Sequence, residues 1–239
     1  MRGQFRTLDP NAAFQPRAFA AAVPGRWHPW PVTLERSKSP SLDSPSLPPP
    51  IATVTAGGLA IGILTSFGQG ALPSGITSLA NSAGAWSLAA FLLCLGNPVP
   101  RRGLLLGLLA LLSMLAGYMA ATELRGFATG TSLWLFWGVA AIVVGPVLGV
   151  GAAWVRASDP RRIAAGAGAI AGILVGEGAY GLTVIADTTS PVYWTLQIIV
   201  GLGIVLAAVI RLRRTASIGL CAGVTAAVAV AFYVTYSSL

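Results

Sequence analysis

The sequence predicts an all-α protein, a polytopic transmembrane bundle of seven helices preceded by a disordered tail. Of the 239 residues, 55% are apolar and only 9% are charged, and the mean hydropathy is +0.75, values atypical of a water-soluble domain. The apolar residues form long continuous runs, whereas a transmembrane barrel would show short strands of alternating polarity. In lipid, helices are then the structure that satisfies the backbone hydrogen bonds.

Residues 1–50 differ in composition from the rest of the chain. They hold 10 of the 16 prolines and six of the 15 Lys and Arg residues. Their longest apolar run, residues 18–23, is too short for a signal peptide. We therefore expect two parts, a disordered, basic, Pro- and Ser-rich cytoplasmic tail over residues 1–50 and a transmembrane domain over residues 51–239.

Seven apolar stretches follow the tail. A helix rises 1.5 Å per residue, so roughly 20 apolar residues cross a hydrocarbon core of about 30 Å. The stretches of suitable length are residues 51–72, 76–95, 103–122, 131–155, 163–186, 192–210 and 215–236. The connections between them are short, which leaves no room for a further soluble domain after residue 50.

The arginines predict the orientation of the bundle. Cytoplasmic loops retain Lys and Arg, and in the seven-span arrangement one side carries only Arg125. The other side carries eight arginines: Arg101, Arg102, Arg156, Arg161, Arg162, Arg211, Arg213 and Arg214. This asymmetry predicts that the N-terminus is inside and the C-terminus outside. Because the positive charges flank spans, the net charge of +8 indicates contact with a lipid bilayer and not with nucleic acid.

Small residues recur every fourth position on two spans and predict close helix packing. They are Gly58, Gly62, Ser66 and Gly70 on the first span, and Gly168, Gly172 and Gly176 on the fifth. We expect these faces to contact other helices of the same chain, although the same spacing also fits a homo-oligomer.

Glu177 is the one carboxylate deep inside a predicted span. It lies 14 residues after the start of the span over residues 163–186, which predicts a position near mid-membrane. A charge at that depth is costly and marks a functional hypothesis. Glycines at 176, 178 and 181 leave room around it, and Tyr180 follows on the same helix face.

Other polar side chains fall in the outer half of neighbouring spans. Ser78, Asn81 and Ser82 have the spacing of one helix face and predict a polar stripe on the second span. Together with Glu177 they predict an outward-facing polar cavity with that carboxyl group at its floor. The candidate solute- or ion-binding residues are Glu177, Asn81, Gln69, Gln197, Tyr180, Glu123 and Arg125.

We expect Arg125 to pair with Glu123 or Asp187, or to reach towards Glu177. Trp86 and Trp137 lie deeper in their spans and are interpreted as packing residues rather than a platform for a ligand.

Two interpretations of Glu177 are open. In one, the carboxyl group takes up and releases a proton or binds a cation, and the chain transports a small solute or ion. In the other, it ties helices together, and the chain is a non-catalytic membrane scaffold or partner subunit. An enzyme acting on lipid would need a second carboxylate within a few Å and is favoured less than either.

The remaining chemistry is limited by where two residues lie. The sole histidine, His28, and the sole lysine, Lys38, both belong to the tail. The spans therefore offer no histidine for a metal, a haem or a Ser-His-Asp triad, and no lysine for a retinal Schiff base. No cofactor, metal site or catalytic residue is predicted.

Three segments resemble a known family. They are LTSFGQG at residues 64–70, LP at residues 72–73 and SLANSAGAW at residues 78–86. Together they are similar to a family of uncharacterised bacterial multi-pass membrane proteins, and the resemblance covers residues 51–239. It implies a multi-pass protein of the bacterial inner (cytoplasmic) membrane, and it implies neither an activity nor a site.

Overall fold

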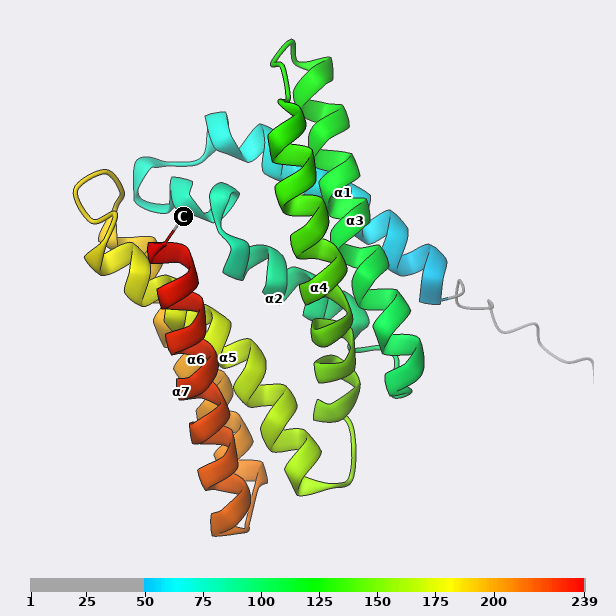
Figure 1. Ribbon diagram of the computed structural model, residues 1–239, viewed down its shortest axis with the longest axis vertical. Coiled ribbons are helices and arrows are strands. Elements are labelled where there is room, and N and C mark those ends of the chain that lie inside the picture. Colours follow the sequence, from blue (N-terminus) through cyan, green and yellow to red (C-terminus); the bar gives the residue numbers. More distant parts are fainter. Residues whose placement is uncertain (1–49, 239) are drawn as a thin grey trace, which may run out of the picture. The chain divides into compact units, whose positions relative to one another are not determined.

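The computed structural model describes residues 50–238, apart from the side chain of Leu133, and this part of the chain is helical without any strand (Figure 1). Its elements are α1 (Pro50–Ala71), η1 (Ser74–Asn81), α2 (Ala83–Cys94), α3 (Pro100–Leu124), α4 (Thr131–Val155), α5 (Pro160–Thr183), α6 (Pro191–Arg211) and α7 (Thr215–Ser237). The predicted all-α membrane bundle is confirmed. The predicted disordered tail lies outside the described residues, except for Pro50.

Six of these helices, α1 and α3 to α7, are long and apolar enough to cross a membrane. The second predicted span differs. It consists of the 3₁₀ helix η1 and the 12-residue helix α2, which meet at an angle of 63°. The count is therefore seven spans when this bent pair is taken as one broken span.

The break in the second span has a local cause at Ser82. This residue is extended, with φ −95° and ψ 123°, and its Oγ accepts a hydrogen bond of 2.9 Å from the N–H of Ala85. A serine in this position caps and so begins a new helix. The predicted polar stripe on one continuous helix is therefore wrong, because Asn81 ends η1 and Ser82 begins α2.

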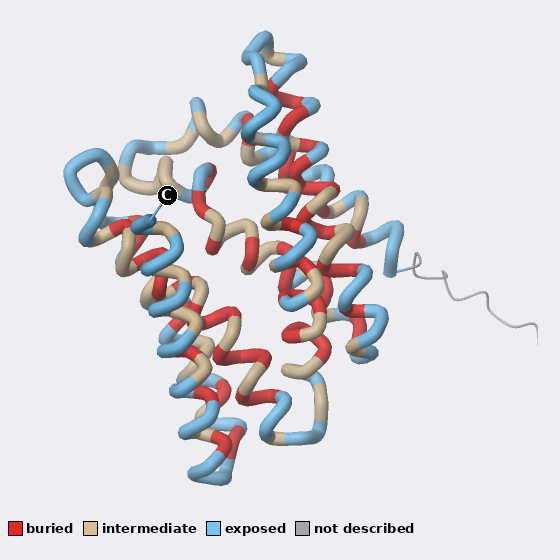
Figure 2. Tube along the Cα trace, in the orientation of Figure 1, coloured by how far each residue is buried: buried red, intermediate tan, exposed pale blue. Residues whose placement is uncertain are grey.

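Helix α2 lies between two groups of three helices (Figure 1). Helices α1, α3 and α4 pack together on one side of it, and α5, α6 and α7 pack together on the other, with α4 also contacting α5. Buried residues concentrate where the helices meet, while the outward faces are exposed (Figure 2). The exposed side chains include large apolar ones such as Leu64, Val139 and Ile210, as expected for surfaces that face lipid.

The glycine faces pack inside the chain, as predicted. Gly58 and Gly62 of α1 lie against the α3 backbone, while Gly168, Gly172 and Gly176 of α5 lie against α7. A Cβ atom at Gly176 would come within 2.6 Å of the Ala229 carbonyl oxygen. Such close backbone approach is how membrane helices associate without a hydrophobic driving force.

A third glycine contact joins α3 to α4 and was not predicted. Gly103 and Gly107 lie against Gly145 and Gly149. The spacing of four residues on both helices is the signal in the sequence that identifies it.

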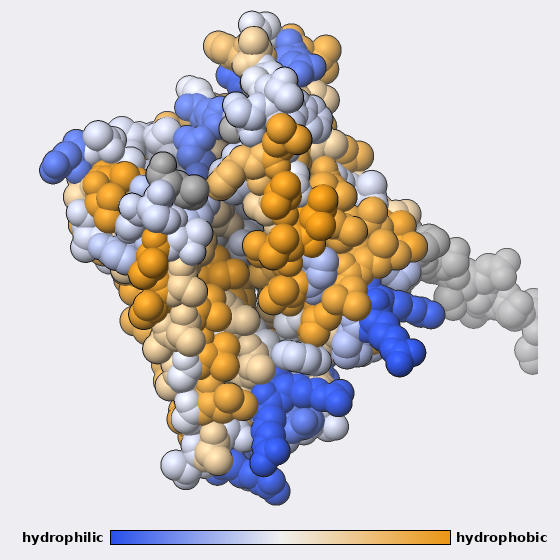
Figure 3. Space-filling view, viewed as in Figure 1, coloured by the Kyte–Doolittle hydropathy of each residue, from blue (hydrophilic) through white to orange (hydrophobic). Residues whose placement is uncertain are grey.

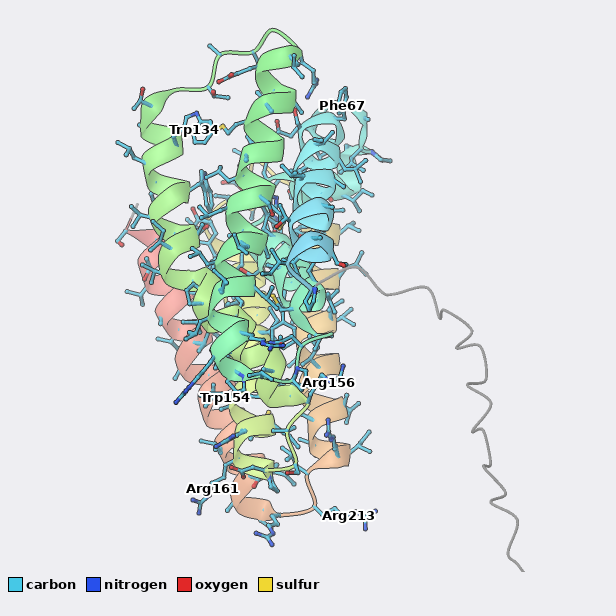
Figure 4. The ribbon with its side chains drawn as sticks, turned by 90° about the vertical axis from the view of Figure 1, so that its right-hand side faces the viewer. Phe67, Trp134, Trp154, Arg156, Arg161 and Arg213 are labelled. Atoms are coloured by element: carbon cyan, nitrogen blue, oxygen red, sulfur yellow. The ribbon has the colours of Figure 1, made fainter. Side chains whose placement is uncertain are left out.

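Most of the arginines in the described residues gather at one end of the bundle. Arg156 donates to the Leu95 carbonyl at 2.9 Å, and Arg211 donates to the Val155 carbonyl at 2.8 Å, so the ends of α2, α4 and α6 meet there. Figure 4 shows Arg161 and Arg213 at this end as well, with Phe67 and Trp134 towards the opposite end. On the face shown in Figure 3, apolar side chains cover the middle of the bundle. Cations near helix C-termini bond carbonyls that lack a partner within the helix.

Candidate functional site

Glu177 of α5 accepts hydrogen bonds from the break in the second span, from the start of α2 and from α6. Its side chain is only 2% exposed. Oε1 accepts from the Ala83 N–H at 2.8 Å, and Oε2 accepts from the Gly84 N–H at 2.7 Å. Oε2 also accepts from Ser82 Oγ at 2.6 Å and from Gln197 Nε2 at 2.7 Å. The carboxyl group thus connects α5, α6 and the first residues of α2.

This arrangement gives hydrogen-bond partners to N–H groups at the start of α2. The first N–H groups of a helix have no partner within the helix, and together they carry the positive end of its dipole. Inside a membrane such groups must be bonded within the protein. The carboxyl group of Glu177 bonds two of them, and a charge-assisted bond of this kind is stronger than a neutral one.

All four partners of Glu177 act as donors towards it. An ionised carboxylate only accepts hydrogen bonds, so the arrangement suits that form. The Ser82 hydroxyl has one hydrogen and two candidate acceptors, Glu177 Oε2 at 2.6 Å and Gln197 Oε1 at 3.1 Å. It can therefore turn from one to the other without any movement of the helices.

Glycine at position 84 makes room for the carboxyl group. A Cβ atom there would lie 2.5 Å from Glu177 Oε2 and 2.6 Å from Gln197 Nε2. At either distance an added Cβ atom would push the carboxyl or amide group away. The hydrogen bonds of Glu177 and Gln197 at the start of α2 are therefore accommodated by Gly84.

The position of Glu177 along its helix differs from the predicted one, because α5 begins and ends earlier than expected. The helix runs from Pro160 to Thr183, not to residue 186, so Glu177 lies about 26 Å from its first residue and about 9 Å from its last. The following residues form turns that lead to α6. Glu177 therefore lies nearer the C-terminal end of α5, towards the end of the bundle opposite most of the arginines, and not halfway along the helix.

A cavity of about 120 Å³ lies beside the break. Its lining residues come from α1, η1, α2, α3 and α4 together with the Ser82 junction: Gln69, Ala80, Asn81, Ser82, Ala83, Trp86, Leu115, Tyr118 and Trp137. Gln69 Nε2 donates to Asn81 Oδ1 at 2.6 Å and to Tyr118 Oη at 3.1 Å. The structure thus brings Gln69 and Asn81, two predicted candidates, together on one cavity.

Glu177 does not line this cavity. Ser82 and Ala83, which both bond to its carboxyl group, form the wall between them. The candidates therefore separate into two adjoining groups, the cavity with Gln69 and Asn81, and the buried cluster with Glu177 and Gln197.

Sequence reasoning did not assign Trp86, Tyr118 and Trp137 to the site. Trp86 packs against the hydrophobic core, and both Trp86 and Trp137 line the cavity. The Trp86 ring meets that of Tyr118 edge to face, with ring centroids 5.9 Å apart. Their position in the sequence, at the depth of the polar residues, is the signal that identifies them.

The other three candidates lie elsewhere. Arg125 bonds to the carbonyl and hydroxyl oxygens of Ser66, and its guanidinium lies over the rings of Phe67 and Phe127 at 5.0 and 5.1 Å. The expected pairing of Arg125 with an acidic residue is wrong, because in residues 50–238 the ion pair is Arg162 with Asp159.

Glu123 is exposed and accepts from Thr129 Oγ1 at 2.6 Å. Tyr180 packs edge to face against Tyr233 and Tyr236 of α7, with ring centroids 6.5 and 5.6 Å apart. Within the described residues, no three His, Cys, Asp or Glu side chains come together in a way that would hold a metal ion.

These observations define a multi-pass helical membrane protein whose second span is broken in front of a buried carboxyl group. The chain belongs to a family of unknown function, DUF6518, which it matches over residues 43–239, and the predicted resemblance to an uncharacterised membrane family is confirmed. Neither the curated proteins nor the solved structures contain a match to it.

Proposed function

We propose that this protein moves a small solute or ion across the membrane, and that Glu177 is the intramembrane carboxylate on which this movement depends. The observation that supports the proposal best is the break at Ser82, which stands between Glu177 and the polar cavity. Non-helical backbone at membrane depth is tolerated where it is buried in protein or lines a cavity. Broken helices whose ends meet at a binding site are a recurrent feature of transporters.

In this proposal the carboxyl group of Glu177 holds the start of α2 in place. While its carboxyl group bonds the N–H groups of Ala83 and Gly84, the junction between η1 and α2 stays closed over the buried cluster. Protonation would remove the charge that favours these bonds and free the junction to move. The Ser82 hydroxyl, with Gln197 as its second acceptor, would keep a partner in either state.

We also propose the bacterial inner membrane as the location, with the arginine-rich end in the cytoplasm and the C-terminus outside. The concentration of arginines at one end supports this orientation. A reporter enzyme fused after Leu239 that is active on the cytoplasmic side would contradict it.

The test uses the purified chain in lipid vesicles. Uptake of neutral solutes is followed by stopped-flow light scattering, and uptake of protons by an internal pH-sensitive dye. The unchanged protein should exceed empty vesicles for at least one solute or for protons. Glu177→Gln should lower that flux roughly tenfold or more, because one donor would then face an amide NH₂ group.

The matched control is Glu123→Gln, the same substitution at an exposed carboxylate that bonds only Thr129. It should leave the flux unchanged. Both variants must elute as single symmetrical peaks in size-exclusion chromatography, and Glu177→Asp, which keeps the charge, should retain part of the flux. Equal flux through the Glu177→Gln variant and the unchanged protein would overturn the role given to Glu177.

A second candidate is a non-catalytic membrane scaffold or partner subunit in which Glu177 is purely structural. Its support is the complete hydrogen bonding of a carboxyl group that is 2% exposed. Absence of any flux above empty vesicles, with a folded protein that still loses stability on Glu177→Gln, would favour this role.

A further inference from the structure

The walls of the cavity beside the break carry no formal charge among the described residues. Its polar groups are the amides of Gln69 and Asn81, the hydroxyl groups of Ser82 and Tyr118, and backbone atoms. The remaining lining residues are Ala80, Ala83, Trp86, Leu115 and Trp137, which are apolar apart from the indole N–H groups. An ion entering from water would exchange its hydration for these neutral groups alone, at a cost that one or two dipoles do not recover.

The neighbouring charged side chains are hydrogen-bonded to other parts of the protein. Glu177, behind Ser82 and Ala83, accepts four hydrogen bonds, two of them from the positive end of α2. Arg125 lies beyond Gln69 on α1, where it bonds Ser66 and covers two phenylalanine rings. Neither side chain lines the cavity, so an ion inside it would have no direct contact with a group of opposite charge.

The polar groups retain unused hydrogen-bonding capacity of both kinds. Gln69 Nε2 uses its two hydrogens on Asn81 Oδ1 and Tyr118 Oη. In the described part of the chain, Asn81 Nδ2 has no partner and is free to donate, while Gln69 Oε1 and the Tyr118 oxygen can each accept a further bond. The cavity can therefore offer a donor and acceptors to one small molecule between aromatic walls.

The volume limits the molecule that fits. About 120 Å³ is the space of roughly four water molecules, and it is less than the 150 Å³ of a cavity that takes benzene. A solute of about four or five non-hydrogen atoms fills it.

We infer that the cavity selects a small uncharged solute that both donates and accepts hydrogen bonds, of the size and chemistry of a simple amide or urea. This inference rests on the proposed transport function and specifies its substrate class. The solute would take the Asn81 amide hydrogens on its carbonyl oxygen, give its own hydrogens to Gln69 and Tyr118, and place its flat faces against Trp86 and Trp137.

The experiment compares three planar molecules of equal shape and different charge: urea, the guanidinium cation and the nitrate anion. Each is tested in vesicles containing the full chain, with an ionophore present so that no membrane potential limits the ions. Urea uptake should exceed that of empty vesicles, and guanidinium and nitrate uptake should not. Sorbitol, which is neutral but too large, should also be excluded.

Two substitutions connect the flux to this cavity. Asn81→Leu removes the free donor and should slow urea roughly fivefold, the value of one hydrogen bond. Trp137→Ala should widen the cavity and admit sorbitol. Its control is Trp134→Ala, three residues earlier on α4, where the side chain is exposed and lines no part of the cavity. Trp86 is avoided because it also borders an apolar groove between α1 and α2.

The outcomes separate the inference from the proposed function. Faster transport of guanidinium, nitrate or protons than of urea would overturn the inference and leave transport standing. Urea transport that is unaffected by both Asn81→Leu and Trp137→Ala would do the same, because the path would lie elsewhere. If no tested solute or proton moves through the folded protein, the transport function itself fails and the inference fails with it.

Discussion

Glu177 and Arg125 are charged side chains of opposite sign, and each bonds the backbone of a neighbouring helix. Glu177 accepts from N–H groups at the start of α2, whereas Arg125 donates to a carbonyl group in the last part of α1. Glu177 thus faces the positive end of the α2 dipole, and Arg125 directly follows the last residue of α3, at the negative end of that helix. Neither pairs with the other, although both lie towards the end of the bundle opposite most arginines.

The two sites differ in how far they depend on these contacts. Glu177 is buried, and its four partners are all inside the protein, so water cannot replace any bond that is lost. Arg125 is half-buried and keeps access to water or lipid headgroups. Both charged side chains are stabilised by contacts with a helix backbone. The stability of the fold depends more on the contacts of Glu177, because that side chain is buried.

Removing the buried carboxyl group of Glu177 should have the largest effect on the free energy of unfolding. Glu177→Ala leaves the N–H groups of Ala83 and Gly84 and the Gln197 amide without their acceptor, and should lower the free energy of unfolding by roughly 3–5 kcal/mol. Chemical denaturation in detergent micelles measures it. Glu123→Ala, at the exposed carboxylate, should change it by less than about 0.5 kcal/mol. Equal losses in the two variants would show that the Glu177 cluster is not a structural contact.

Displacing the Glu177 carboxyl group without removing it should lower the free energy of unfolding by less. In Gly84→Ala the added methyl group would lie 2.5 Å from Glu177 Oε2, so the carboxyl group must withdraw and lose part of its contacts, for about 1–3 kcal/mol. Gly203→Ala, with open space around it on α6, should be neutral or slightly stabilising.

The effects of Glu177→Ala and Gly84→Ala on the free energy of unfolding should also be coupled. In the Glu177→Ala background the carboxyl group is absent, so Gly84→Ala should cost clearly less than it does alone. Strict additivity in the same denaturation assay would mean that the methyl group acts through something other than the carboxyl group.

The parts of the fold predicted from the sequence are those set by local pattern. Apolar runs of sufficient length gave the helices, and a spacing of four residues gave the faces of Gly58 and Gly62 on α1 and of Gly172 and Gly176 on α5. These patterns act within one helix, so no knowledge of the neighbouring helix is required.

The break at Ser82 could not be predicted in the same way, because residues 76–95 are continuously apolar enough to read as one span. What holds the break is Glu177, 95 residues further along the chain, together with Gln197 on another helix. The SAGA sequence at residues 82–85 carries the local part of the signal, a capping serine followed by a glycine that permits close approach. The cavity follows from the break, so its aromatic walls were missed with it.

Replacing the half-buried Arg125 should lower the free energy of unfolding less than the changes at Glu177 and Gly84. Arg125→Gln removes the charge near the ends of α1 and α3 and the contacts with Phe67 and Phe127, for about 1 kcal/mol of unfolding free energy. Because this site has access to solvent, the loss should shrink as salt rises and screens the charge, whereas the loss in Glu177→Ala should hardly change. Arg213→Gln, at an exposed arginine at the other end, is the control and should be neutral. Chemical denaturation of the variants at low and high salt measures these differences. If Arg125→Gln lowered the free energy of unfolding as much as Glu177→Ala does, and equally at both salt concentrations, burial would not explain the difference between the two sites.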